Sequence, residues 1–183
     1  MKKLTLGMAV FFCGGSVAIA DTMPSDAWYV APSVNWTKPD TSFGVGKRDV
    51  GAGVRFGKAL SPNVDIQLGP TYVSVKDTNV HYQQYTLGVD GLYLFSRGNF
   101  RPLVLAGIGG EYDKKDAPGV NTSKTSPYID AGLGFQYAFN DKVALQADYR
   151  RVHGFLRGND FGFKRSDNDY LTVGVNIGFG GAH

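Results

Sequence analysis

Seven charged residues are the first candidates for chemistry in this chain. Each of them directly precedes or follows an apolar or aromatic residue: Arg55, Asp65, Asp90, Glu111, Asp130, Asp148 and Arg150. Charges in such surroundings must be paired or hydrated, because an isolated charge in an apolar medium is costly. The chemistry open to this set is therefore an internal network of ion pairs, or a polar gate along a narrow path for ions.

Residues suited to catalysis or metal binding are sparse. The histidines His81, His153 and His183 are too scattered for a metal site, and no Asp or Glu cluster has metal spacing. His153 is followed by glycine and phenylalanine rather than by a His-x-Ser arrangement. The Gly-x-Gly patterns lack the lysine and the following helix of a phosphate loop, at 51–53, 107–109 and 132–134. The sequence therefore predicts no enzyme and no cofactor.

An alternation of period two positions the charged residues. In 171–179 large apolar residues occupy every odd position, while threonine, asparagine and glycines occupy the even ones. These even residues are too small and polar to pack a soluble core, which favours an apolar face toward lipid and a polar face toward a lumen. Segments of about nine to twelve residues repeat the pattern, at 28–36, 49–60, 64–75, 84–95, 101–112, 128–139, 143–151 and 171–179.

The connections between these segments alternate in length. No run of about 18 apolar residues follows residue 20, so a membrane protein of this composition has to be a barrel. Turns near 61, 97 and 141 are short, and the other connections are mostly long: 37–48, 76–81, 113–125 and 152–168. Short periplasmic turns and longer external loops are typical of membrane barrels. We predict an all-β fold, an eight-stranded antiparallel up-and-down transmembrane β-barrel.

Aromatic residues mark both expected edges of the apolar band. Trp28 and Trp36 lie eight residues apart on one face, which is about 20 Å of height for a strand tilted by about 40°. Further aromatics fall near the periplasmic ends of their segments, at Phe56, Phe95, Phe139 and Phe179. Others fall near the external ends, at Tyr72, Tyr112 and Tyr149. Together they predict two aromatic girdles.

The turns also predict which charges meet inside the barrel. If the turn near residue 141 sets the register, paired residue numbers sum to roughly 281, which brings Asp130 next to Arg150. By the same argument, Arg55 and Asp65 should be diagonal neighbours.

Two local features disturb the regular pattern. Pro32 lies in the middle of the first segment, and a closed barrel has no edge that tolerates a missing N–H, so we expect a bulge or a local break there. Leu103 and Leu105 blur the phase of the fifth segment.

The N-terminus has the features of a secretory signal peptide. Two lysines open the chain, 4–17 is apolar and small, and Ala18 and Ala20 form an A-x-A cleavage site before Asp21. A run of about 15 residues is short for a transmembrane helix.

Cleavage would divide the chain into a signal peptide at 1–20 and one barrel domain at 21–183. The mature chain would have 183 − 20 = 163 residues and a net charge of 17 − 16 = +1. Cys13 would be lost with the signal, which leaves no disulfide or thiolate site.

Two stretches resemble a known family. The sequence at 101–109 looks like an R-P-aromatic-V-x-A-G-x-G strand and that at 173–179 like a closing L-G-V-x-Y-x-F-G strand, both of the outer membrane protein A family. The resemblance implies that family's eight-stranded transmembrane domain in a Gram-negative outer membrane. The chain stops at His183, so a periplasmic peptidoglycan-binding domain is not implied, and Phe179 resembles the signal read by the barrel-assembly machinery.

The expected role is structural or surface-interacting, in adhesion or envelope integrity. Three alternatives stay open: a lipid A-modifying outer-membrane enzyme, a narrow low-conductance pore, and a soluble ligand-binding barrel. Expected partners are outer-membrane lipid, lipopolysaccharide, the assembly machinery, and a host or surface ligand at the external loops, but no nucleic acid. The external loops hold basic residues, at Lys38, Lys47, Arg48, Lys114, Lys115, Lys124, Arg157, Lys164 and Arg165, and apolar ones, at Phe155, Leu156, Phe161 and Phe163.

Overall fold

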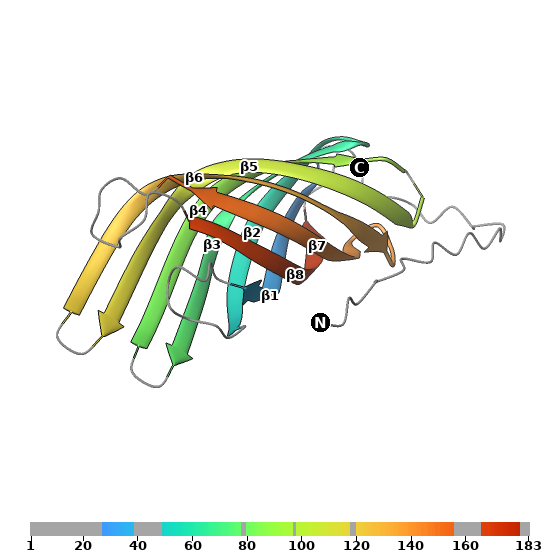
Figure 1. The fold of residues 1–183 in the computed structure, drawn as a ribbon. Coiled ribbons are helices and arrows are strands. Elements are labelled where there is room, and N and C mark those ends of the chain that lie inside the picture. The colour runs from blue at the N-terminus through green and yellow to red at the C-terminus, as the bar shows by residue number, and fades with distance from the viewer. Residues whose placement is uncertain are drawn as a thin grey trace, which may run out of the picture.

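The computed structural model is a closed barrel of eight antiparallel strands, each hydrogen-bonded to its neighbours in sequence, and the first is bonded to the last (Figure 1). The structure describes residues 27–38, 49–77, 80–96, 98–117, 120–155 and 166–179. The strands are β1 (Trp28–Lys38), β2 (Asp49–Ser61), β3 (Val64–Asp77), β4 (Val80–Leu94), β5 (Phe100–Ala117), β6 (Val120–Ala138), β7 (Val143–Gly154) and β8 (Ser166–Phe179). The predicted fold class is confirmed.

The strands are strongly tilted against the barrel axis. A row of paired residues that starts at Trp28 and passes once around the barrel returns to β1 at Lys38, which is 38 − 28 = 10 residues further along. The row runs through Trp28, Lys58, Ile66, Gly91, Ala106, Ala131, Arg151, Asp169 and Lys38. This stagger, with the usual strand spacings, corresponds to a tilt of about 40°.

Burial in this barrel is the reverse of that in a soluble protein. Ile108 and Leu133 point outward with 66% and 62% of their surface exposed, whereas Glu111 and Asp113 point inward with 0% exposed. The alternation holds along the strands because successive side chains point to opposite faces. No helix in the described ranges is long and apolar enough to cross a membrane.

Two hairpins reach further than the sequence predicted. Pairing of β5 with β6 continues to Ala117 and Val120, so most of the stretch 113–125 that we expected as a loop is strand. Pairing of β3 with β4 likewise continues to Asp77 and Val80. Figure 1 shows both hairpins extending past the other strands. The period-two signal is lost there because the sequence of both extensions is mostly polar.

The expected irregularity at Pro32 is a local break and not a bulge. Ala31 and Pro32 are unpaired with β8, but the register is the same on both sides of them. The described pairs contain a register shift elsewhere, between Ala59 and Ser61 where β2 meets β3. A proline removes one ladder hydrogen bond without requiring an extra residue.

Candidate functional site

Five charged side chains meet in the middle of the barrel interior. Arg150 is central: its Nη2 lies 2.8 Å from Asp148 Oδ1, and its Nη1 lies 3.0 Å from Asp90 Oδ2 and 3.7 Å from Asp130 Oδ2. Arg55 Nη1 lies 2.8 Å from the same Asp90 oxygen. Two cations therefore face three carboxylates, drawn from β2, β4, β6 and β7. An ion pair this buried is held by mutual neutralisation, and removing one partner is far costlier than removing the set.

Arg55 does not pair with Asp65, contrary to the register argument. Arg55 lies level with Gly69, between the paired residues Gly53 and Phe56, so Asp65 is four residues away along β3, or about 13 Å. Asp65 instead accepts a hydrogen bond of 3.0 Å from the Tyr29 hydroxyl. The two charges of the sequence-based pair thus belong to different layers of the interior.

An amide layer fills the interior on the periplasmic side of the charges. Gln146 Oε1 accepts hydrogen bonds from Gln67 Nε2 at 3.2 Å, Gln136 Nε2 at 3.1 Å and Asn176 Nδ2 at 3.1 Å. Gln146 Nε2 in turn donates to Asp148 Oδ1 at 3.1 Å. This amide therefore joins four strands and connects their layer to the charged layer.

Four leucines lie inside the barrel toward its periplasmic end, where we had expected a polar lumen. They are Leu92, Leu94, Leu103 and Leu105, each at most 4% exposed. Leu103 and Leu105 blurred the sequence pattern because β5 is apolar on both faces here. The pair on β5 lies opposite the pair on β4, since Leu92 pairs with Leu105 and Leu94 with Leu103. The cluster covers one side of the lumen with hydrocarbon.

The external end of the interior holds tyrosines and carboxylates. The Tyr82 hydroxyl donates to Asp113 Oδ1 at 2.5 Å, and Gln84 Nε2 donates to Glu111 Oε2 at 3.2 Å. The Tyr170 hydroxyl donates to the Gln84 side-chain oxygen. Tyr82, Tyr128 and Tyr170 pack with two valines into a buried cluster, and the sequence analysis did not predict it.

Gly107 lies where the interior leaves no room for a side chain. A Cβ on Gly107 would lie 2.2 Å from Asp90 Oδ1 and 2.8 Å from Asp130 Oδ1, whereas a Cβ on Gly110 would meet nothing within 4 Å. We expect Gly107→Ala to lower the free energy of unfolding by about 1–3 kcal/mol, because the methyl group forces apart a packed ion network. Gly110→Ala, on the same strand, should leave it unchanged or raise it by about 0.5 kcal/mol. Urea titrations in lipid vesicles measure both, and equal effects would contradict this account.

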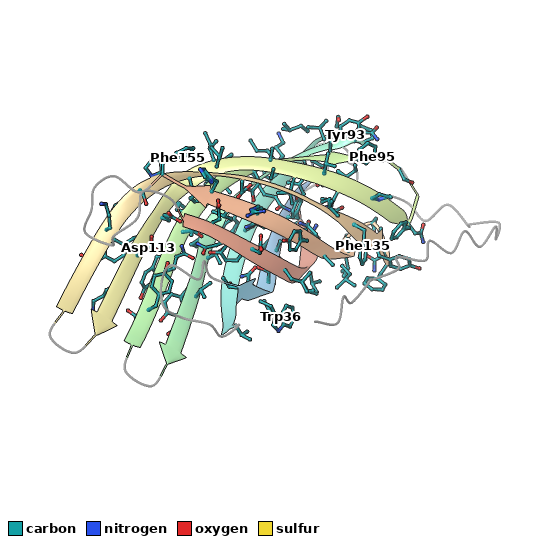
Figure 2. All side chains as sticks on the ribbon, viewed as in Figure 1. Trp36, Tyr93, Phe95, Asp113, Phe135 and Phe155 are labelled. Carbon is teal, nitrogen blue, oxygen red and sulfur yellow. The ribbon has the colours of Figure 1, made fainter. Side chains whose placement is uncertain are left out.

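The aromatic residues assigned to the girdles all point outward. Their exposed fractions run from 37% for Tyr72 to 61% for Phe95, and Figure 2 shows Trp36, Tyr93, Phe95 and Phe135 on the outside of the strands. The full set is Trp28, Trp36, Phe56, Tyr72, Phe95, Tyr112, Phe139, Tyr149 and Phe179. Tyr149 pairs with Leu133, which is six residues from Phe139 at the periplasmic rim, so Tyr149 lies lower on the wall than an external girdle residue.

A histidine and a carboxylate form a close pair on the outer face near the external end of β7 and β8. His153 Nδ1 lies 2.6 Å from Asp167 Oδ1, and the His153 ring meets the Phe155 ring edge-on at 4.9 Å between centroids. Such a pair could orient a general base, which would need a nucleophile within reach. Phe155 lies two positions after His153 in the sequence, where a His-x-Ser arrangement would have its serine. Among the described residues, no group of three or more possible metal ligands is present.

Several of the expected sites lie outside the described residues. These are the signal peptide with Ala18, Ala20 and Asp21, the loop residues Lys47, Arg48, Leu156, Arg157, Phe161, Phe163, Lys164 and Arg165, and His183.

Comparison with known proteins assigns the chain to a family. Residues 7–180 match the model of the outer membrane protein beta-barrel domain. No curated protein matches this chain.

Several solved structures share the fold at low sequence identity. The Neisserial surface protein A is 20% identical with a TM-score of 0.71, over 83% of this chain and 97% of that one. The Ail protein of Yersinia pestis is 10% identical with a TM-score of 0.59, over 85% and 99%. The N-terminal barrel of Pseudomonas aeruginosa OprF is 17% identical with a TM-score of 0.59, over 82% and 97%. The chain is therefore a member of the outer membrane protein beta-barrel domain family, which places it in a Gram-negative outer membrane.

Proposed function

We propose that this protein is a closed outer-membrane barrel that acts through its external surface, in adhesion or envelope integrity, and neither conducts solutes nor catalyses a reaction. The observation that carries the proposal is the filled interior. The ion network, the amide layer and the two apolar clusters together occupy the lumen. Two spaces along it hold about 20 and 10 Å³, room for about one water molecule each.

The external hairpins supply a surface for interaction. The β5–β6 hairpin continues five residues beyond Tyr112, to Ala117, and is fully paired. A hairpin with a paired backbone loses less conformational entropy on binding than a mobile loop. The structurally similar Ail is named as an attachment invasion locus protein, which agrees with a role at the surface.

Export and assembly belong to the same proposal. Cleavage after Ala20 would release the barrel domain to the periplasm, and Phe179 ends β8 at the periplasmic rim, where assembly machinery and lipid would meet it. The lipid A-modifying alternative has one feature in its favour, the pair of His153 and Asp167, but the position two residues after the histidine holds a phenylalanine.

Conductance measurements test whether the barrel is closed, and cell phenotypes test the role at the external surface. Purified protein in planar bilayers should give no reproducible conductance steps, and steps like those of a small pore would overturn the closed barrel. In cells that lack the chain, wild type should restore adhesion or detergent resistance, whereas a variant with residues 115–122 replaced by Asn-Gly should not. Heat-modifiable migration on a gel confirms that the variant is folded. Full restoration by this variant would contradict a role for the hairpin.

A further inference from the structure

The outer wall contains a groove of about 260 Å³ on β2, β3 and β4. Ala52, Val54 and Pro70 lie along it and point outward, and they are smaller than the leucines, phenylalanines and tyrosines that cover most of the wall. Val54 and Pro70 are not paired with each other, although Gly53 and Phe56 on either side of Val54 keep their partners on β3. The hollow is therefore built from small side chains at a point where proline interrupts the ladder.

Two tyrosines bound the external side of this groove. The Tyr72 and Tyr85 ring centroids are 4.7 Å apart, and Tyr112 follows at 6.3 Å from Tyr85. Tyr72 and Tyr85 remain 37% and 47% exposed on the lipid-facing side. Tyrosines at this level mark the boundary between hydrocarbon and headgroups. The groove thus begins just inside the outer leaflet and runs toward the middle of the membrane.

A polar row lies directly outside the tyrosines on the same face. Ser74 pairs with Gln83, and Gln83 pairs with Lys114, two residues beyond Tyr72, Tyr85 and Tyr112 respectively. Lys114 supplies a positive charge at this level on a long side chain that can reach toward the interface. From the middle of the wall outward, the order is apolar groove, tyrosine hydroxyls and cation. A phosphate-bearing lipid has the same order of acyl chain, ester linkage and headgroup.

From this arrangement we infer that the groove is a lipid site, which binds one acyl chain of a phosphate-bearing lipid of the outer leaflet with its phosphate toward Lys114. The groove is continuous with the wall that already faces hydrocarbon, so an acyl chain reaches it without crossing water. An unfilled hollow would forfeit the dispersion contacts of its lining atoms. The inference depends on the location of the chain in the outer membrane and is independent of the proposed surface role.

Native mass spectrometry of the full chain in mild detergent tests the site. Wild type incubated with phosphatidylglycerol should retain one lipid, and should retain less of a diacylglycerol with the same chains. Ala52→Phe fills the groove and should lower the retained fraction about five-fold or more, as should Val54→Phe. Ala106→Phe places the same ring on the neighbouring strand β5, outside the lining of the groove, and should retain lipid like wild type.

Two lysine variants test the headgroup end of the site. Lys114→Gln should lower phosphatidylglycerol retention about three-fold, which is modest because the charge is partly exposed, whereas Lys142→Gln at a periplasmic turn should have no effect. Heat-modifiable migration identifies folded variants. Equal retention by Ala52→Phe and Ala106→Phe, equal binding of the two lipids, or no effect of Lys114→Gln would overturn the inference.

Discussion

Replacing Arg150 by methionine should lower the free energy of unfolding by about 3–5 kcal/mol, because it leaves buried carboxylates without their shared cation. Arg150 contacts Asp90, Asp130 and Asp148 within 3.7 Å and is only 3% exposed. Methionine keeps most of the volume, so the loss measures charge and not a cavity. Urea unfolding in lipid vesicles, followed by gel migration and tryptophan fluorescence, gives the value.

Two further variants test whether the unpaired carboxylates cause this loss of stability. Arg151→Met, next in the chain but with a side chain that is 66% exposed, should change the free energy of unfolding by no more than about 0.5 kcal/mol. Adding Asp90→Asn to Arg150→Met should recover part of the loss, because fewer like charges then share the interior. A double variant that is no more stable than Arg150→Met would show that the ion network does not control stability.

Leu133→Arg should lower the free energy of unfolding by about 2–4 kcal/mol, the cost of a cation at the membrane midplane. Leu133 is 62% exposed. It lies six residues from Phe139 at the periplasmic rim and eight from Thr125, the partner of Tyr112. In a soluble barrel an exposed leucine tolerates arginine within about 0.5 kcal/mol. The same unfolding titration in vesicles therefore distinguishes a wall in lipid from a wall in water.

Leu60→Arg is the matched control for depth. Leu60 is also outward-facing and 52% exposed, but it lies at the end of β2 beside the periplasmic turn. The cost there should be about 0–1 kcal/mol, because the arginine can reach the headgroups. Equal costs at Leu60 and Leu133 would contradict the assigned depth of the wall.

The strands could be predicted from the sequence because lipid and lumen impose opposite demands on alternate residues. In 171–179 every large apolar residue faces outward, as predicted. The outer ends of β5 and β6 are mostly polar in sequence and carry no such signal, so their extension to Ala117 and Val120 could not be predicted. The leucine cluster was hidden for the opposite reason, because β5 is apolar on both faces near Leu103.

Contacts inside the lumen were only partly predictable. The register across one turn identifies neighbours on adjacent strands, and it places Asp130 close to Arg150. Arg55, however, reaches Asp90 on β4, which is not adjacent to its own strand β2. A long side chain that crosses a narrow interior finds partners that no hairpin register encodes. Such contacts follow from the closed barrel and not from any local pattern.

The ten-residue stagger around the barrel also determines how much the interior can hold. The radius depends on strand number and stagger, so closure with a stagger of eight or twelve would change the cross-section by roughly 15–20% in either direction. A shift of the pairing register by one residue would turn the side chains of the ion network toward lipid. A shift by two residues would bring these side chains too close together or move them out of contact. The side chains that fill the lumen therefore favour the register in which β1 pairs with β8. Through that register they determine the width of the barrel.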